Sequence, residues 1–243
     1  MGTLGGSEDH TAILGARLGA LAQYAFVPVR HERDVPLPND HVFLVATSGV
    51  VAAKGGGARD QYNRASALAS AALRIWRAAS GSEAATLTAA LGESPDMIEQ
   101  LRIAVHAQRD LPYDADALLR RVEQLCAELL IVQEAGDALV RGDLSRLGEL
   151  VDRSQANAER VLGNQVPETI ALARSARQLG AVAASAFGAG FGGSVYALVR
   201  SSDAEAFRSR WCERYLRLFP QHAGLTSFFM TRAGPPSTPR SAV

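Results

Sequence analysis

A run of glycines between two apolar segments constrains this chain more than any other feature. Residues 187–193 read F-G-A-G-F-G-G, and the glycines in this run are Gly188, Gly190, Gly192 and Gly193. Glycine loses more conformational freedom on folding than any other residue, so such a run indicates a backbone that needs positive φ or a very close approach to another group. Residues 181–186 before it and residues 194–199 after it are apolar and β-prone. The pattern therefore predicts two strands joined by a glycine turn.

Phosphate is a common partner of such a turn, because successive backbone N–H groups can point at its oxygen atoms. The spacing also satisfies G-x-G-x-x-G, but the dinucleotide-binding form of that motif follows a strand and opens a helix. Here a strand is predicted after the glycines, which argues against a Rossmann-type site. A plain hairpin with an adaptable loop fits the same residues, and both interpretations stay open.

Composition excludes several classes of function. The 243 residues are 47% apolar, enough for a substantial core, and carry a formal net charge of zero. A neutral chain lacks the broad field that attracts nucleic acid or anionic lipid. It also has no apolar run long enough to span a bilayer and no signal-peptide pattern, so we expect a cytoplasmic protein that binds neither membrane nor nucleic acid. The histidines and cysteines show no spacing typical of a metal site, and no metal ligand is predicted.

Hydrophobic periodicity predicts strands and helices in mixed order. Strands are expected at residues 18–26, 41–47, 181–186, 194–199 and 225–231. Helices are expected at residues 62–76, 94–106, 115–140, 144–162, 167–180 and 203–219. The prolines at 28, 36 and 38 indicate a loop between the first two strands. This order predicts an α+β fold with helices packed on one face of an antiparallel sheet.

Asp9 is the first candidate for catalysis. It lies in a glycine-flanked segment just before residues 11–14, which read as strand-like, so a loop could present its carboxylate to a cleft. A general base needs an ionised group within hydrogen-bond reach of the proton that it removes. Glu8 and His10 are alternatives for this role, and Asp9 as a simple turn cap is another.

Two further polar segments are candidates for binding. Residues 48–49, S-G, end a predicted buried strand, and residues 62–64, Y-N-R, lie on the next helix. Tyrosine and asparagine can bind sugar hydroxyls, and arginine can bind phosphate, although the same residues also fit an ordinary helix surface. Residues 154–157, S-Q-A-N, are expected to face solvent unless another element covers them.

Taken in order, these segments resemble those of the GHMP family of sugar kinases, in the galactokinase and L-arabinokinase branch. Residues 5–10, G-G-S-E-D-H, resemble the family segment that contains the catalytic aspartate. Residues 45–50, V-A-T-S-G-V, with the later Y-N-R, are similar to the S-G-V…Y-N-x-R stretch whose tyrosine lies at the sugar site. Residues 185–193 resemble the third conserved motif, which usually ends T-G-x-G-F-G-G. The resemblance runs from residue 5 to about residue 231.

The resemblance implies a kinase that transfers phosphate from ATP, accompanied by Mg²⁺, to a hydroxyl of a monosaccharide such as galactose. Asp9 would orient or deprotonate that hydroxyl and, with Tyr62, would bind the sugar. The four glycines of residues 188–193 would support the phosphate-binding loop. Two departures are Phe187, where the family commonly has threonine, and His10, where glutamine is more usual.

The family's phosphate-binding second motif, P-x-x-x-G-L-S-S-S-A, is not found in this sequence. The resemblance therefore implies that residues 1–50 are a remnant of the amino-terminal domain and residues 51–232 the carboxy-terminal domain, followed by a disordered tail at 233–243. The resemblance leaves two places for the missing half: an upstream part of a longer chain, or a partner, a separately encoded amino-terminal half. A regulatory relative that binds sugar or nucleotide without catalysis, and an inactive fragment, are the alternatives.

Overall fold

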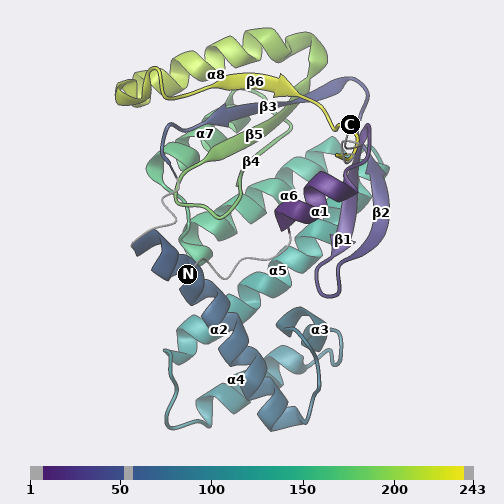
Figure 1. Ribbon diagram of the computed structural model, residues 1–243, viewed down its shortest axis with the longest axis vertical. Coiled ribbons are helices and arrows are strands. Elements are labelled where there is room, and N and C mark those ends of the chain that lie inside the picture. The colour runs from purple at the N-terminus through teal and green to yellow at the C-terminus, as the bar shows by residue number, and fades with distance from the viewer. Residues whose placement is uncertain (1–7, 52–56, 238–243) are drawn as a thin grey trace, which may run out of the picture.

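The computed structural model describes residues 8–51 and 57–237, and the side chains of residues 57–59, 61 and 62 also lie outside that description. Figure 1 shows an upper part, in which helices surround a sheet, and a lower part made of helices. The long helix α5 (Ala115–Val140) belongs to both parts and has the bounds that the sequence predicts. The chain thus builds two cores along one helix.

The principal sheet is antiparallel, with the strand order β4-β5-β3-β6. Its strands are β3 (His41–Thr47), β4 (Ala183–Phe187), β5 (Ser194–Arg200) and β6 (Phe228–Thr231). All four were expected from the sequence, although the last begins three residues later than predicted. The register pairs Leu44 of β3 with Ala197 on one side and with Met230 on the other. The strand from the first fifth of the chain therefore lies inside a sheet built mostly from the last third.

Helices pack on this sheet as the predicted α+β class requires, but they cover both of its faces and not the single face that the sequence predicted. Val42 and Leu44 face α7 (Pro167–Gln178) and α8 (Ala204–Leu218), around the fully buried Trp211. Phe43, between these two residues, points to the opposite face, where α5 and α6 (Leu144–Asn157) cover the sheet as well. Because both faces are covered, β3 reads as a continuous apolar run and not as an alternating one.

The lower part is a second core of helices. It is formed by α2 (Gly57–Ser80), α3 (Leu87–Leu91), α4 (Met97–His106) and the first half of α5. Leu101, Leu118 and Val122 are fully buried there. The short helical turns of the chain are η1 (Ala158–Leu162), η2 (Ser201–Asp203) and η3 (Pro220–His222). Among the described helices, none is both long and apolar enough to cross a membrane.

The prediction of a loop around residues 28–38 is wrong. Residues Arg30–Pro36 form β2, which pairs with β1 (Ala20–Ala25) in a separate two-stranded sheet. The sequence of β2, R-H-E-R-D-V-P, lacks the alternation of apolar and polar residues that predicts a strand, because Val35 is the one buried residue in it. The ribbon is held on α5 by Arg33, which donates to Asp137 Oδ1 at 2.5 Å and to the Gln133 carbonyl at 2.9 Å.

The start of the described chain is also helical, where the sequence indicated a strand-like run. Helix α1 (Glu8–Gly15) includes residues 11–14, and its first turn carries Glu8 and Asp9, which the positive end of the helix dipole favours. Residues at the far end of the chain lie against it, since the Ser237 amide donates to the Ile13 carbonyl at 2.9 Å. Residues 238–243 of the predicted tail lie outside the described residues.

Candidate active site

The glycine turn, residues 188–193, joins β4 to β5 as predicted. Gly188, Gly190, Gly192 and Gly193 all have positive φ, between 84° and 131°. These values lie in the region that side chains disfavour, which explains the residue type. A Cβ added at Gly188 or Gly193 would meet no atom within 4 Å, so at these two positions the conformation alone calls for glycine.

Gly190 differs, because another part of the chain approaches it closely. A Cβ at this position would lie 2.2 Å from the Asn164 carbonyl oxygen and 2.7 Å from Asn164 Nδ2. The amide of the next residue, Phe191, donates to that same carbonyl at 2.6 Å. At Gly190, the close contact predicted from the glycine run is therefore a contact with Asn164 of the same chain.

Residues 48–50, S-G-V, lie directly against the glycine turn. The Ser48 amide donates to the Gly193 carbonyl at 2.8 Å, and the Gly193 amide donates to the Val50 carbonyl at 2.9 Å. Ser48 is fully buried. The fold thus brings together two motifs that the sequence separates by more than half of its length.

Aromatic residues of the last third support this junction. The Tyr215 hydroxyl donates to the Ser48 carbonyl at 2.5 Å, and burial raises the tyrosine pKa, which keeps the hydroxyl protonated as a donor. His222 stacks beside Tyr215 and lies under Gly49, where a Cβ would come within 3.1 Å of its Nδ1. His222 Nε2 is 3.1 Å from Glu168 Oε1. These residues carry no motif, so sequence reasoning did not find them.

The polar segment 154–157 is covered, not solvated. Gln155 is buried, and its Oε1 accepts hydrogen bonds from Ser185 Oγ and from the Ala186 amide, both at 2.9 Å. Ser154 and Asn157 both donate to Glu128 of α5. Gln155 therefore fixes the end of β4 just before the glycine turn, a role that depends on a contact between distant elements.

Asp9 lies in the first turn of α1, and its side chain is exposed. The expected loop is thus a helix N-terminus, while residues 5–7 of the motif lie outside the described residues. The competing Glu8 lines a pocket of about 720 Å³ between α1 and β1. Among the described residues that line this pocket, none belongs to the glycine turn, so it does not unite Asp9 with the glycines.

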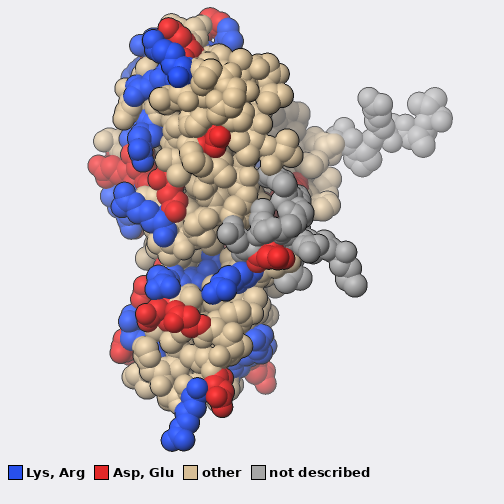
Figure 2. All heavy atoms as spheres, turned by 90° about the vertical axis from the view of Figure 1, so that its left-hand side faces the viewer, with Lys and Arg blue, Asp and Glu red and all other residues tan. Residues whose placement is uncertain are grey.

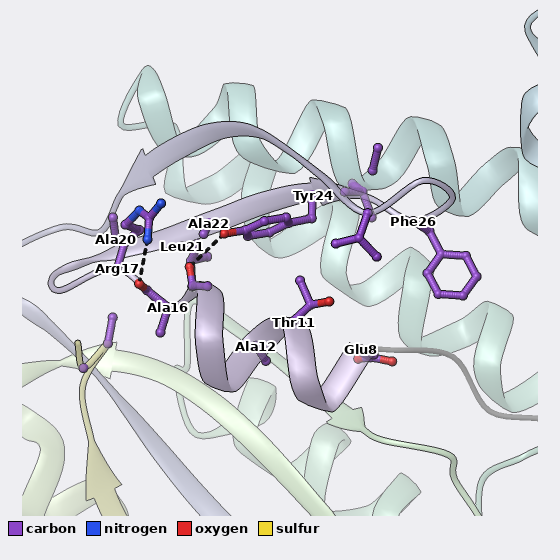
Figure 3. Close-up of a pocket in the computed structure, with 16 residues that line it drawn as sticks. Glu8, Thr11, Ala12, Ala16, Arg17, Ala20, Leu21, Ala22, Tyr24 and Phe26 are labelled. Carbon is purple, nitrogen blue, oxygen red and sulfur yellow. Dashed lines mark hydrogen bonds between the residues drawn. The ribbon is translucent and has the colours of Figure 1, made fainter. Parts of the chain in front are cut away.

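The pocket itself, here called the α1–β1 pocket, is mainly apolar. Figure 3 shows Thr11 of α1 pointing toward Tyr24 of β1, whose hydroxyl donates to the Gly15 carbonyl. Ala12 and Phe26 also line the pocket. Val132 of α5 and residues 233–234 complete its lining. A pocket of this size and composition can receive a ligand or the side chains of another polypeptide.

Tyr62, predicted to hold the sugar, lies in the second turn of α2, and its side chain is outside the described residues. The following Asn63 is partly buried and Arg64 is exposed. In the part of the chain that the structure describes, no group of three or more His, Cys, Asp or Glu side chains could hold a metal ion.

Residues 137–217 match the family model described as GHMP kinases C terminal. Two curated relatives, the galactokinases of Limosilactobacillus reuteri strain DSM 20016 and of Limosilactobacillus reuteri subsp. reuteri strain JCM 1112, are each 35% identical over 96 residues. Each match covers 39% of this chain and 24% of the relative. The relatives are therefore much longer than the part that this chain matches.

The fold is similar to that of Lactococcus lactis galactokinase, solved in complex with galactose, with a TM-score of 0.72 and 25% identity. The similarity covers 94% of this chain and 54% of that galactokinase. The chain therefore spans about half the length of that galactokinase. Residues 137–217 are thus similar to the C-terminal domain of the GHMP kinases, and the chain as a whole is similar in fold to about half of a galactokinase.

Proposed function

We propose that this chain is the carboxy-terminal part of an ATP-dependent sugar kinase, which transfers the γ-phosphoryl group to a monosaccharide hydroxyl. Galactose or a related sugar is the proposed acceptor, because the homologues are galactokinases. The observation that carries the proposal is the pair of hydrogen bonds between residues 48–50 and Gly193. Two segments that resemble separate kinase motifs thereby meet in one place.

Asp9 is the proposed base. Its carboxylate is exposed at the N-terminus of α1, where a sugar hydroxyl could approach within hydrogen-bond distance. It would accept the hydroxyl proton, or orient the hydroxyl, as the new oxygen–phosphorus bond forms. Tyr62 would hold the sugar. In phosphoryl transfer, positioning and charge stabilisation supply most of the catalysis.

The glycine turn fits a role beside the nucleotide. Gly188 is exposed, and the open space where its Cβ and that of Gly193 would lie allows another group to approach the backbone. The turn is also rigidly backed by Asn164 on one side and by residues 48–50 on the other. When bound, ATP with Mg²⁺ would supply the phosphoryl group and neutralise its charge; the chain's part is to hold the backbone in place.

A partner segment is part of the proposal. The likeness to the Lactococcus lactis galactokinase leaves 46% of that chain without a counterpart here (100 − 54). The α1–β1 pocket has exposed apolar side chains at its border, among them Leu21, Phe26, Val29 and Val132. Apolar surface of this kind marks contact with another polypeptide. We propose that the rest of the kinase fold covers this apolar surface, carried upstream or on a separate chain. The expected cytoplasmic location stays a prediction.

The test compares two neighbouring carboxylates. Asp9→Asn and Glu8→Gln change equally exposed residues in the same turn, but only the first removes the proposed base. ATP-dependent phosphorylation of galactose and of a panel of other monosaccharides is measured with the chain alone and with the rest of the kinase fold supplied. Asp9→Asn should lower turnover by about 100-fold or more, while Glu8→Gln stays within about threefold.

Each other outcome has a definite meaning. Near-normal turnover in Asp9→Asn would remove Asp9 from the role of base. Binding of sugar or ATP by the wild-type protein without any phosphoryl transfer, even with the rest of the fold present, would replace the kinase with a regulatory binding protein. If the protein shows neither ligand binding nor phosphoryl transfer, the chain is an inactive fragment.

A further inference from the structure

The chain takes an unusual path after α6. The helix changes at Ala158 into a π-helical turn, η1, and ends at Gly163, which has a φ of 65°. Turns of this kind are rare and are frequently found at functional sites. The sequence predicted one continuous helix to residue 162. The change of winding places the next residue, Asn164, directly against the glycine turn.

Asn164 contacts three consecutive residues of the glycine turn. Its Nδ2 donates to the Ala189 carbonyl at 3.3 Å, and its carbonyl accepts from the Phe191 amide at 2.6 Å. Between them, Gly190 is so close to Asn164 that no side chain fits. One residue thus fixes the middle of the turn with both its backbone and its side chain.

The turn needs this support because one of its residues is strained. Phe191 has a φ of 59° and is the one described non-glycine residue with positive φ. A bulky side chain disfavours this conformation, which persists only where the surroundings impose it. The hydrogen bond from the Phe191 amide to Asn164 provides such a constraint.

Asn164 is itself held in one orientation. Its Oδ1 accepts from Gln165 Nε2 at 3.0 Å, which leaves Nδ2 to donate to the turn. Gln165 Oε1 in turn accepts from the hydroxyl of Thr169, a fully buried residue in the first turn of α7. The network connects the glycine turn to the start of a core helix.

We propose that Asn164 is a positioning residue for the nucleotide: it holds residues 189–191 so that the exposed backbone of the glycine turn has the shape that ATP meets. This inference rests on the proposed function, because that function assigns the turn to the nucleotide. The residue acts through the turn and has no proposed contact with the reacting atoms.

The test uses two asparagines that lie on either side of η1. Asn164→Ala removes the donor to Ala189, and Asn164→Asp removes the donor while keeping the shape. Asn157→Ala is the control, because Asn157 donates to Glu128 and has no recorded contact with the turn among the described residues. Binding of Mg·ATP and of galactose is measured by calorimetry, and amide hydrogen exchange of residues 187–193 by mass spectrometry, in the chain joined by the rest of the fold.

Both Asn164 variants should bind Mg·ATP about fivefold more weakly, the loss expected for one positioned hydrogen bond, with galactose affinity within about twofold. Exchange in residues 187–193 should rise in both, and the control should match the wild type. Equal losses for ATP and galactose, or unchanged exchange, would overturn the inference. Faster exchange in the variants of a protein that binds no ATP would instead overturn the proposed function and leave Asn164 as the residue that orders the turn.

Discussion

At the scale of single residues, different constraints require glycine at different positions of the glycine turn. Gly188 and Gly193 satisfy a backbone conformation, whereas Gly190 also satisfies a close contact with Asn164. The sequence predicted both reasons for the run as a whole. It could not assign them to positions, because the contact comes from a segment with no motif of its own.

Alanine substitutions at Gly190 and at Gly142, a glycine outside the turn, separate the cost of the backbone conformation from the cost of the close contact. Gly142 has a φ of 69° with open space around it, so Gly142→Ala should cost roughly 1 kcal/mol of unfolding free energy. Gly190→Ala has the same conformational cost and in addition forces apart two backbone segments, so it should cost about 1–3 kcal/mol more. Denaturant unfolding measures both, and equal losses would contradict the close contact.

Two tyrosines in the upper part should make the stability of the folded state depend on pH in the alkaline range. Burial raises the pKa of Tyr196 to about 12 and also raises that of Tyr215. An unfolded tyrosine ionises near pH 10, so the folded state is fully favoured below that pH and loses stability as the pH rises toward 12. Tyr215→Phe should flatten this loss and should itself cost about 1–2 kcal/mol at neutral pH, because the Ser48 carbonyl loses its donor.

Unfolding curves at pH 8, 10 and 11 provide the comparison. Tyr113→Phe is the control, since Tyr113 packs at the border of the lower helical core and no hydrogen bond of its hydroxyl is recorded among the described residues. A Tyr215→Phe protein with the same pH dependence and the same neutral stability as the wild type would show that the hydroxyl is not held by Ser48.

At the scale of helices and strands, long periodic segments were predicted well and exposed ones were not. Helix α5 and strand β3 have the predicted bounds, because many apolar residues specify each of them. Strand β2 and helix α1 were missed. Both are largely exposed, so their apolar pattern carries little information. Their structure depends on neighbouring elements: β2 pairs with β1 and contacts α5, and α1 accepts a hydrogen bond from Tyr24 of β1.

Docking of the β1–β2 ribbon depends on Arg33. Arg33→Ala should release the ribbon from α5 and raise hydrogen exchange in residues 20–36 several-fold, because two-stranded sheets are marginally stable by themselves. Arg30→Ala is the matched control, an exposed arginine of the same strand that pairs with Glu32. Equal exchange in the two variants would contradict the role of Arg33.

The same contact should respond to acid. The hydrogen bond from Arg33 lowers the pKa of Asp137 below its usual 3.8. A lowered folded pKa means that the carboxylate contributes to docking above the unfolded pKa, and that the contribution disappears as the pH falls through the folded value. Exchange of the ribbon should therefore rise on acidification below about pH 4 in the wild type. In Asp137→Asn it should be fast already at neutral pH.

At the scale of the whole molecule, the candidate site comes from segments that are far apart in the sequence. Residues 48–50, Asn164 and the glycine turn meet through backbone and side-chain hydrogen bonds. The sequence predicted the first and last of these by resemblance to known motifs. The roles of Asn164 and Gln155 could not be predicted, because they arise only once β4, α6 and the turn are packed.

Figure 2 shows how charge lies over one face of the molecule. Uncharged side chains dominate the face over the sheet-containing upper part, while basic and acidic side chains mix along its border and over the lower helical part. The α1–β1 pocket is bordered by exposed apolar side chains, among them Leu21 and Val132. We expect the pocket to be covered by the rest of the kinase fold.

A charge placed in the pocket tests this expectation. Val132 lines the pocket and Val140 does not, although both are on α5 and are 52% and 58% exposed. Val132→Lys should weaken binding of the segment that carries the P-x-x-x-G-L-S-S-S-A motif by about tenfold or more, while Val140→Lys leaves it unchanged. Equal binding by both variants would place that segment elsewhere on the chain.

Hydrogen exchange with ligands is the most direct test of the proposal that Asp9 and the glycine turn belong to one sugar and nucleotide site. The chain joined by the rest of the fold is compared with and without Mg·ATP, and with and without galactose. We predict slower exchange in residues 187–193 with Mg·ATP and in residues 8–15 with galactose, and protection of both segments when the two ligands are present. Ligand binding that protects neither segment would contradict a shared sugar and nucleotide site.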